Sequence, residues 1–336
     1  MGGNKTVFAP SDMAFSQANM NMSDSQRLLA VLKYHIVNST LTNDAIPGDD
    51  NEHRIVLSSL RGEPYVQLPN NRSQALVIAQ GQSNNGGDDN DDNDNDNMGR
   101  IIEPSQNVSF NLGSAVSYMN IRLVPINNVL TVPGSLPSTL QTLNLTTLST
   151  LAQQNQLVQP LNSTDAVTVF APTNAAIDSV MNQYNMANDT QKRAVIANHV
   201  VNGTVVYSTQ LSGDNAVKNA TSASGEQLTF EEDDNTLYVR SGDVRARIVR
   251  SDNLASNGVV HVIDTVLLNT MSNPSAAASA ASSAATAPVN TGGVSGGTNG
   301  DDNDNDRNHM NGAMGVAAGV ATVGLVALSS GVLLLA

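Results

Sequence analysis

The sequence is short of several residue types. It has no cysteine and no tryptophan among its 336 residues, and only 3% of them are aromatic. Without cysteine, no disulfide bond braces the chain, and no thiolate can serve as a nucleophile or metal ligand. Val, Leu, Ile, Ala and Met must fill the cores, which suffices in domains of this length at ~25 cal/mol per Å2 of buried apolar area.

Enzyme motifs are scarce as well. The sequence has no phosphate-binding glycine loop and no His-Glu-X-X-His zinc motif. His35, His199 and His261 do not stand at metal-ligand spacing, and carboxylates cluster only in two acidic runs. We therefore expect a chain that is not an enzyme and that uses no cofactor and no metal.

Positive charge is also scarce, since 16 Lys and Arg stand against 30 Asp and Glu. Removing the two Asp/Asn-rich runs, which hold ten aspartates, changes the net charge from −14 to −4. This balance argues against nucleic-acid partners, which require a basic face. The first run lies in an insertion at 82–99. Its Asp92, Asp94, Asp96 and Glu103 have EF-hand-like spacing, but strands rather than helices are predicted around them, so we favour a disordered acidic loop over calcium binding.

One segment of the sequence occurs twice. Thr6–Phe15 reads Thr-Val-Phe-Ala-Pro-Ser-Asp-Met-Ala-Phe, and it returns at Thr168–Ile177 as Thr-Val-Phe-Ala-Pro-Thr-Asn-Ala-Ala-Ile. A second match aligns the helical segments that carry His35 and His199. A repeat at this spacing predicts two complete modules in tandem rather than a solenoid.

The repeated unit reads as a strand, then helices, then several strands. Val-Phe-Ala-Pro predicts a strand that proline ends, and Ser11 or Thr173 then caps a helix. Short β-branched runs follow, and four pairs match: Gly62-Glu63 with Gly225-Glu226, Leu76–Ile78 with Leu237–Val239, Arg100–Ile102 with Arg247–Val249, and Ile126–Leu130 with Ile263–Leu267. The order predicts α+β modules, each a β-sheet wedge with helices packed at one side.

The two copies differ at both ends. A helical stretch with leucines at i, i+3 or i+4 spacing, Leu136–Leu161, precedes the second copy, whereas nothing equivalent precedes Thr6. The closing block of the second copy, Asn257–Asp264, predicts a turn and a central strand that carries His261; in the first copy, Asn120–Asn127 lacks the glycine and the histidine. We expect modules at 1–132, N-terminally incomplete, and 136–270.

The opening block Thr168–Asn174 and the closing block Asn257–Asp264, in this order, resemble those of the fasciclin (FAS1-type) domain family. The chain looks similar to fungal GPI-anchored fasciclin-like cell-surface proteins. The resemblance implies adhesion or matrix binding. In that family a Tyr-His pair and an Asp-Ile pair have been tied to receptor binding; Tyr34-His35 matches the first, and Asp252 stands at the second without the isoleucine.

The ligand-binding candidates that the resemblance implies are Tyr34, His35, His199, Asp252 and His261. The alternative interpretation makes them framework residues, with imidazoles hydrogen-bonded to backbone. The partners implied are cell-surface, matrix or cell-wall components, with possible homotypic contact and membrane attachment.

The carboxyl end predicts an anchor. Residues 313–336 contain no ionisable side chain, a length that can cross a hydrocarbon core of ~30 Å, and no Lys or Arg follows Arg307. This pattern favours a cleaved GPI signal, with attachment at Gly297, Asn299 or Asn311. The alternative is a retained transmembrane span in a vacuolar or other internal-membrane protein that acts in membrane organisation or fusion.

Residues 271–312, rich in Ser, Thr, Ala and Gly, are predicted to be a disordered stalk and acidic spacer whose hydroxyls carry O-glycans. Ten Asn-X-Ser/Thr positions are candidates for N-glycosylation: Asn4, Asn21, Asn38, Asn71, Asn107, Asn144, Asn162, Asn188, Asn202 and Asn219. Asn38 and Asn202 stand three residues after the equivalent histidines, so one surface position is marked in both copies.

Overall fold

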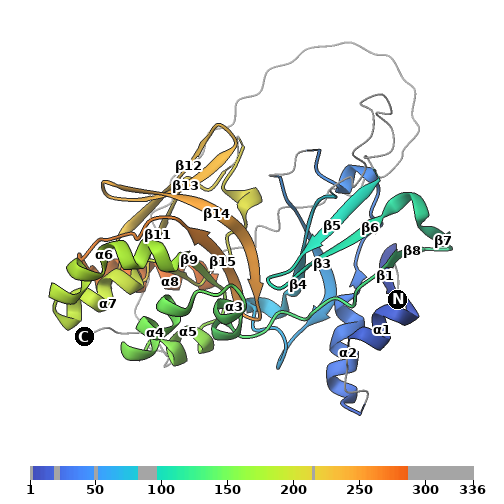
Figure 1. Ribbon diagram of the computed structural model, residues 1–336, viewed down its shortest axis with the longest axis horizontal. Coiled ribbons are helices and arrows are strands. Elements are labelled where there is room, and N and C mark those ends of the chain that lie inside the picture. Colours follow the sequence, from blue (N-terminus) through green and yellow to red (C-terminus); the bar gives the residue numbers. More distant parts are fainter. Residues whose placement is uncertain (1–2, 19–22, 49–51, 82–96, 214–215, 287–336) are drawn as a thin grey trace, which may run out of the picture.

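The protein consists of two modules that lie side by side in a computed structural model (Figure 1). The structure describes residues 3–18, 23–48, 52–81, 97–213 and 216–286. Asn21, most of the acidic insertion, the three predicted anchor-attachment residues and the apolar segment 313–336 lie outside these ranges. Within them, every helix is too short or too polar to span a bilayer.

The first module is a sheet that closes on itself, with two helices at one side (Figure 1). The sheet order is β1-β2-β3-β4-β5-β6-β8-β7, and β1 also pairs in parallel with β8. Its elements are β1 (Lys5–Pro10), α1 (Asp12–Gln17), α2 (Ser25–Tyr34), β2 (Ile36–Val37), β3 (Arg54–Arg61), β4 (Ser73–Gln80), β5 (Met98–Ile102), β6 (Asn107–Asn111), β7 (Val116–Tyr118) and β8 (Ile121–Ile126), with 3-10 turns at Asn43–Ala45, Pro69–Asn71 and Leu112–Ser114.

The second module begins with three helices and ends with one. Its sheet order is β10-β9-β15-β14-β13-β12-β11. The elements are α3 (Leu136–Thr142), α4 (Thr146–Gln154), α5 (Val158–Ser163), β9 (Val167–Pro172), α6 (Asn174–Met186), α7 (Asp189–Ala197), β10 (Val200–Asn202), a 3-10 turn (Ser208–Gln210), β11 (Asn219–Thr221), β12 (Gln227–Asp233), β13 (Thr236–Ser241), β14 (Val244–Ala255), β15 (Gly258–Ile263) and α8 (Pro274–Thr286). The predicted α+β class with two sheet-and-helix modules is confirmed.

The repeat extends to individual hydrogen bonds. The hydroxyl of Thr6 donates to the Ser39 carbonyl and accepts from Leu41 N–H, both at 2.8 Å. The hydroxyl of Thr168 donates to the Thr204 carbonyl at 2.8 Å and accepts from Val206 N–H at 2.9 Å. Each threonine therefore fastens its first strand to the segment that follows the second strand, because a hydroxyl can donate and accept at once.

Both ends of the predicted repeat alignment are confirmed by strand register. Phe8 on β1 pairs with Val124 on β8, and Phe170 on β9 pairs with His261 on β15. The predicted helix caps are also present, since Ser11 accepts from Ala14 N–H and Thr173 accepts from Ala176 N–H. The strand β15 is buried along its whole length between β9 and β14, as the apolar run on both faces predicts.

Two of the predicted strand matches are wrong by one strand. The antiparallel ladder β3-β4-β5-β6 corresponds to β11-β12-β13-β14. Leu76–Ile78 on β4 therefore matches β12, not Leu237–Val239 on β13. Arg100–Ile102 on β5 matches β13, not β14. The insertion at 82–99 thus interrupts a hairpin whose counterpart turns on Asp234-Asn235. Both residues have positive φ (47° and 56°), as a two-residue type I′ turn requires.

The start of the predicted stalk is also wrong, because residues 274–286 form α8. Asn273 caps this helix by accepting from Ala276 N–H at 3.1 Å, and Pro274 follows at the first helical position. Alanine has the highest helix propensity, and the half-buried alanines of α8 lie against β10 and β11. A composition that is unable to form a core by itself can therefore still cover one.

Candidate functional site

The candidate site lies where the two modules meet. A buried apolar cluster spans the junction; it contains Ala75 and Val77 of β4 together with Ala166, Val205, Leu254 and Val259 of the second module. Hydrogen bonds to backbone carbonyls join the modules as well, since Gln67 N–H donates to the Ser256 carbonyl at 2.8 Å and the Gln74 side-chain amide donates to the Ala255 carbonyl at 2.9 Å. The junction is therefore packed and hydrogen-bonded like a core.

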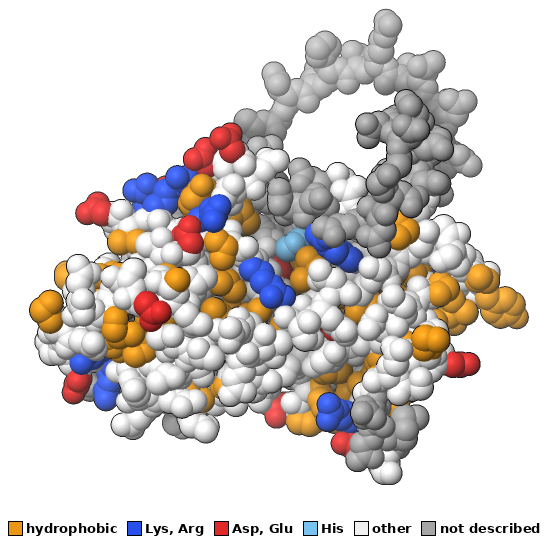
Figure 2. Space-filling view, in the orientation of Figure 1, with side chains coloured by type: hydrophobic (Ala, Val, Ile, Leu, Met, Phe, Trp, Pro, Cys, Tyr) orange, Lys and Arg blue, Asp and Glu red, His pale blue; other side chains and the backbone are white. Residues whose placement is uncertain are grey.

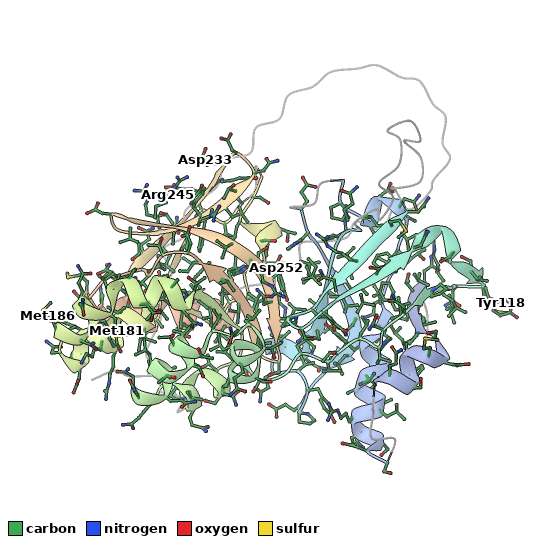
Figure 3. All side chains as sticks on the ribbon, viewed as in Figure 1. Tyr118, Met181, Met186, Asp233, Arg245 and Asp252 are labelled. Carbon is green, nitrogen blue, oxygen red and sulfur yellow. The ribbon has the colours of Figure 1, made fainter. Side chains whose placement is uncertain are left out.

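Asp252 is the buried acid of this junction (Figure 3). A β-bulge in β14 and a left-handed backbone conformation (φ 57°) turn its fully buried carboxylate toward the first module. Oδ2 accepts from His53 Nδ1 at 2.8 Å, across the module boundary, and from the Ser208 hydroxyl, while Oδ1 accepts from Ser208 N–H at 2.8 Å. Burial opposes ionisation of Asp252, but these donors and the neighbouring imidazoles hold its pKa below the usual value.

The Ser-His-Asp composition of this cluster is not a hydrolytic triad. In a triad, aspartate and serine bind opposite nitrogens of the imidazole, so that the imidazole can take the serine proton. Here the Asp252 carboxylate and the Ser208 hydroxyl both lie on the Nδ1 side of His53, and the Ser208 hydroxyl donates to the carboxylate itself. The arrangement anchors a buried charge and leaves no activated nucleophile.

His261 supports Asp252 from the second module. Its Nε2 donates to the Val206 carbonyl at 2.8 Å, and its Nδ1 accepts from Asp252 N–H at 3.3 Å. The ring also stacks on Phe170 at a centroid distance of 5.5 Å. Burial lowers the pKa of His261, so the imidazole is neutral near pH 7. The corresponding residue of the first module is Val124, which has no such role.

His35 and His199 make one and the same arrangement in the two modules. Nδ1 donates to the carbonyl four residues earlier, Val31 or Val195, at 2.7 Å. Nε2 accepts from the N–H of Leu130 or Leu267 at 2.9 Å. Burial lowers the pKa of both imidazoles, that of His199 to about 4. Each histidine thus fastens the segment after the last strand of its module, as the framework interpretation describes.

Tyr34 is 1% exposed, and its hydroxyl donates to the Ala75 carbonyl at 3.1 Å. Of the five residues that the family resemblance suggested, only Asp252 and His261 lie together at the junction. The sequence analysis did not single out His53 and Ser208, because neither residue stands in a repeated segment or in a family-like block. The sequence groups no carboxylates with histidines outside the acidic runs, yet the fold brings His53 and His261 to Asp252.

The N-glycosylation candidates differ in accessibility. In the described ranges, Asn162 and Asn202 are half-buried, and the other described candidates are exposed. The position shared by the two copies is exposed at Asn38, but at Asn202 the side-chain oxygen is buried without a partner. The described residues hold no group of three or more His, Cys, Asp or Glu side chains that could bind a metal.

Comparison with known proteins agrees with the repeat. The model of the fasciclin domain matches residues 1–93 and 143–269. The chain belongs to the fasciclin family. Fasciclin domains support a cell-surface, adhesion-type role.

Similar proteins include two fungal fasciclin-like proteins and one cyanobacterial protein. "Fasciclin-like arabinogalactan protein CTB11" of Cercospora beticola is 25% identical over 276 residues, which cover 79% of this chain and 67% of that protein. A fasciclin-like arabinogalactan protein of Arthroderma benhamiae is 30% identical over 142 residues, 42% of this chain and 32% of its own length. Protein sll1483 of Synechocystis is 34% identical over 130 residues, 37% of this chain and 67% of that protein.

Among solved structures, the FAS1 domain pair of the insect cell adhesion molecule fasciclin I is similar, with a TM-score of 0.40 and 18% identity. The match covers 79% of this chain and 89% of that one.

Proposed function

We propose that this fasciclin protein is a non-catalytic surface protein whose module pair contacts matrix, cell-wall or cell-surface components. The observation that carries the proposal is the pair of matched fasciclin modules fused through a buried junction. The histidines of the framework support it, because each is buried and hydrogen-bonded to backbone, and the Ser-His-Asp cluster lacks the geometry of a nucleophile.

The anchor belongs to the same proposal. Residues 313–336 act as a GPI signal, and the lipid attaches at Gly297, Asn299 or Asn311, so that the modules stand outside the plasma membrane or in the wall. Glycans at the exposed Asn-X-Ser/Thr positions fit such a location. The two fungal relatives are named fasciclin-like arabinogalactan proteins, and these names support the same location.

The apolar length of 313–336 also supports a second candidate, a retained span in an internal membrane such as that of a vacuole. Treatment of intact cells with a phosphatidylinositol-specific phospholipase separates the two. Release of the chain into the medium is the expected result. A chain that stays in the membrane fraction, with an intact carboxyl terminus, contradicts the anchored form.

Adhesion is tested with cells that display the full chain. We expect such cells to aggregate or to bind isolated wall material, and we expect phospholipase treatment to abolish the effect. Phe170→Ala, which we expect to destabilise the second module, serves as the control, compared at equal surface display. Aggregation that is equal for the native chain and for this control would show that the modules do not carry the binding.

A further inference from the structure

The junction between the modules also forms a groove of about 650 Å3, which the described function does not use. One wall is the β5–β6 hairpin of the first module, and the other is the turn before β13 together with β14 of the second (Figure 1). His53, which contacts Asp252, lines its floor. Figure 2 shows histidine and Lys/Arg colours close together between the two halves of the molecule.

The charge of this groove is opposite to that of the chain. Arg100, Arg247 and Arg250 line it, whereas Glu103 is its one acidic lining residue. Burial raises the pKa of Glu103 to about 7, despite hydrogen bonds from Gln106 and Thr131, so this carboxyl adds little negative charge below neutral pH. In a chain of net charge −14, three arginines beside one largely neutral acid form a local anion-attracting surface.

The arginines differ in what they already bind. Arg250 donates to the carbonyls of Glu103 and Pro104 at 3.1 Å, across the junction, and Arg247 pairs with Asp264 at 3.4 Å. The Arg100 side chain has no hydrogen bond or ion pair with any described residue, and its Nε is buried without a partner. Arg100 therefore has donors to spare for a ligand, while Arg250 fixes the groove walls.

A second cleft at the same junction repeats the pattern. It has a volume of about 240 Å3 and is lined by Arg61 and Arg72, with no Asp or Glu among its lining residues. Five arginines thus line the two clefts. The larger groove adds neutral amides and hydroxyls from Ser105, Gln106, Asn107, Asn235 and Thr236. Guanidinium groups bind carboxylates in a bidentate manner, and amides and hydroxyls bind sugar hydroxyls.

We propose that this interdomain groove binds a carboxylate-bearing sugar chain, with Arg100 as the principal contact to the carboxylate. The assignment deepens the proposed surface role and rests on it, since acidic glycans are matrix and wall components. It makes the module pair, rather than either module alone, the binding unit.

Binding is measured with the full-length chain in a non-ionic detergent. The protein is produced without N-glycans, because Asn107, which lines the groove, is itself a glycosylation candidate. The probe is polygalacturonate, with uncharged dextran and dextran sulfate as comparisons. We expect saturable binding to polygalacturonate that weakens as salt rises, and none to dextran. Arg100→Gln should weaken the binding about 10-fold, because a charge-assisted hydrogen bond is lost.

Arg193→Gln is the matched control. It removes the same charge from α7, at the end of the second module away from the junction (Figure 1). Equal weakening by both variants would reduce the effect to net charge and overturn the groove assignment. Tighter binding to dextran sulfate, with the same dependence on Arg100, would overturn the choice of carboxylate.

One further outcome concerns the chain's own aspartates at 88–96. If polygalacturonate binds only after these six residues are changed to asparagine, the aspartates of the chain itself occupy the groove and the proposal fails. Surface display and aggregation are measured in parallel on the same variants. Aggregation that persists without any polygalacturonate binding removes the groove assignment alone, whereas loss of surface display removes the proposed function.

Discussion

The two modules share one framework and differ in what covers it. In the second module, α3 and α4 bring Leu140, Leu148 and Leu151 into a core with Ala176, Val195 and Val266. The corresponding residues of the first module are Ala14, Val31 and Val129, and they line an open groove of about 740 Å3 between α1, α2 and the chain that leaves β8. Among the described residues, α3 and α4 thus cover this face in the second module only.

The comparison separates the residues that both modules share from those that one module has alone. The threonine and histidine hydrogen bonds occur in both modules, so they belong to the framework. Asp252 and His261 occur in the second module only, at the places of Ala115 and Val124. The polar junction therefore depends on two residues that only the second module carries.

The largest expected effect tests the equivalence of the two cores. Phe8→Ala and Phe170→Ala each remove a fully buried ring, and each should cost about 3–5 kcal/mol through the cavity left behind. The loss for Phe170 should lie at the upper end of this range, because its ring contacts the rings of Phe230 and His261, each at a centroid distance of 5.5 Å. The ring of Phe8 contacts only that of Phe110, at a centroid distance of 5.3 Å, among the described aromatic pairs. Chemical denaturation with hydrogen exchange resolved by module measures this. Met186→Ala, at an 81% exposed site, is the control; a loss as large there would refute the core placement.

The second prediction concerns one buried titratable group in each module, Glu103 and His199, whose contributions to stability change with pH in opposite directions. Burial lowers the pKa of His199 to about 4, so its contribution to the second module is complete above pH 6.5 and is lost as the pH falls toward 4, by about 3 kcal/mol. Burial raises the pKa of Glu103 to about 7, so its contribution to the first module is complete below pH 4.5 and is lost as the pH rises through 7, by a similar amount.

His35 makes the first module less stable as the pH falls, as His199 does in the second module, because burial lowers the pKa of His35 as well. Glu103→Gln isolates the acid: the loss of first-module stability between pH 4.5 and 7 should disappear, while the second module keeps its profile. Thermal unfolding at a series of pH values, with each module followed separately, measures both. An unchanged pH profile in this variant would mean that Glu103 does not titrate as its burial implies.

The third prediction separates the modules. His53→Ala removes one donor from the buried Asp252 carboxylate, which should cost about 1–3 kcal/mol and fall on the junction rather than on either core. We expect unfolding to change from one coupled transition toward two. Glu52→Ala, at the exposed neighbouring position, should leave the coupling intact. Coupled unfolding that survives His53→Ala would mean that the apolar cluster and the other hydrogen bonds across the junction suffice to couple the modules.

The sequence predicted the parts of each module that depend on local chemistry. Proline ends the first strand, Ser11 and Thr173 cap the next helix, and a run that is apolar on both faces becomes the central strand. Two middle strands of the first module were matched to the wrong strands of the second, one strand too late in each case. Short β-branched runs resemble one another, and only the pairing pattern tells them apart.

The junction was beyond such reasoning. His53 and Asp252 are 199 residues apart, and their contact depends on a bulge and on the docking of two finished modules. Asp252 was singled out through family resemblance, but nothing in its neighbourhood in the chain indicates a partner. The helix α8 was missed for the opposite reason, since its alanine-rich composition fits either a stalk or a helix, and contact with β10 and β11 decides.

The smallest expected effect returns to the helix caps. Ser11→Ala and Thr173→Ala each remove the acceptor for one amide of the first helical turn, which should cost about 1 kcal/mol. The loss should be recorded in the second module for Thr173 and in the first for Ser11, and Thr173→Ser, which keeps the oxygen, should retain most of the stability. The helix α6 (Asn174–Met186) packs against α4, whereas no described helix takes the place of α4 beside α1 (Asp12–Gln17). Fraying after cap removal should therefore spread further in α1, as faster hydrogen exchange along that helix. Equal fraying of both helices would show that the contact with α4 does not limit fraying in α6.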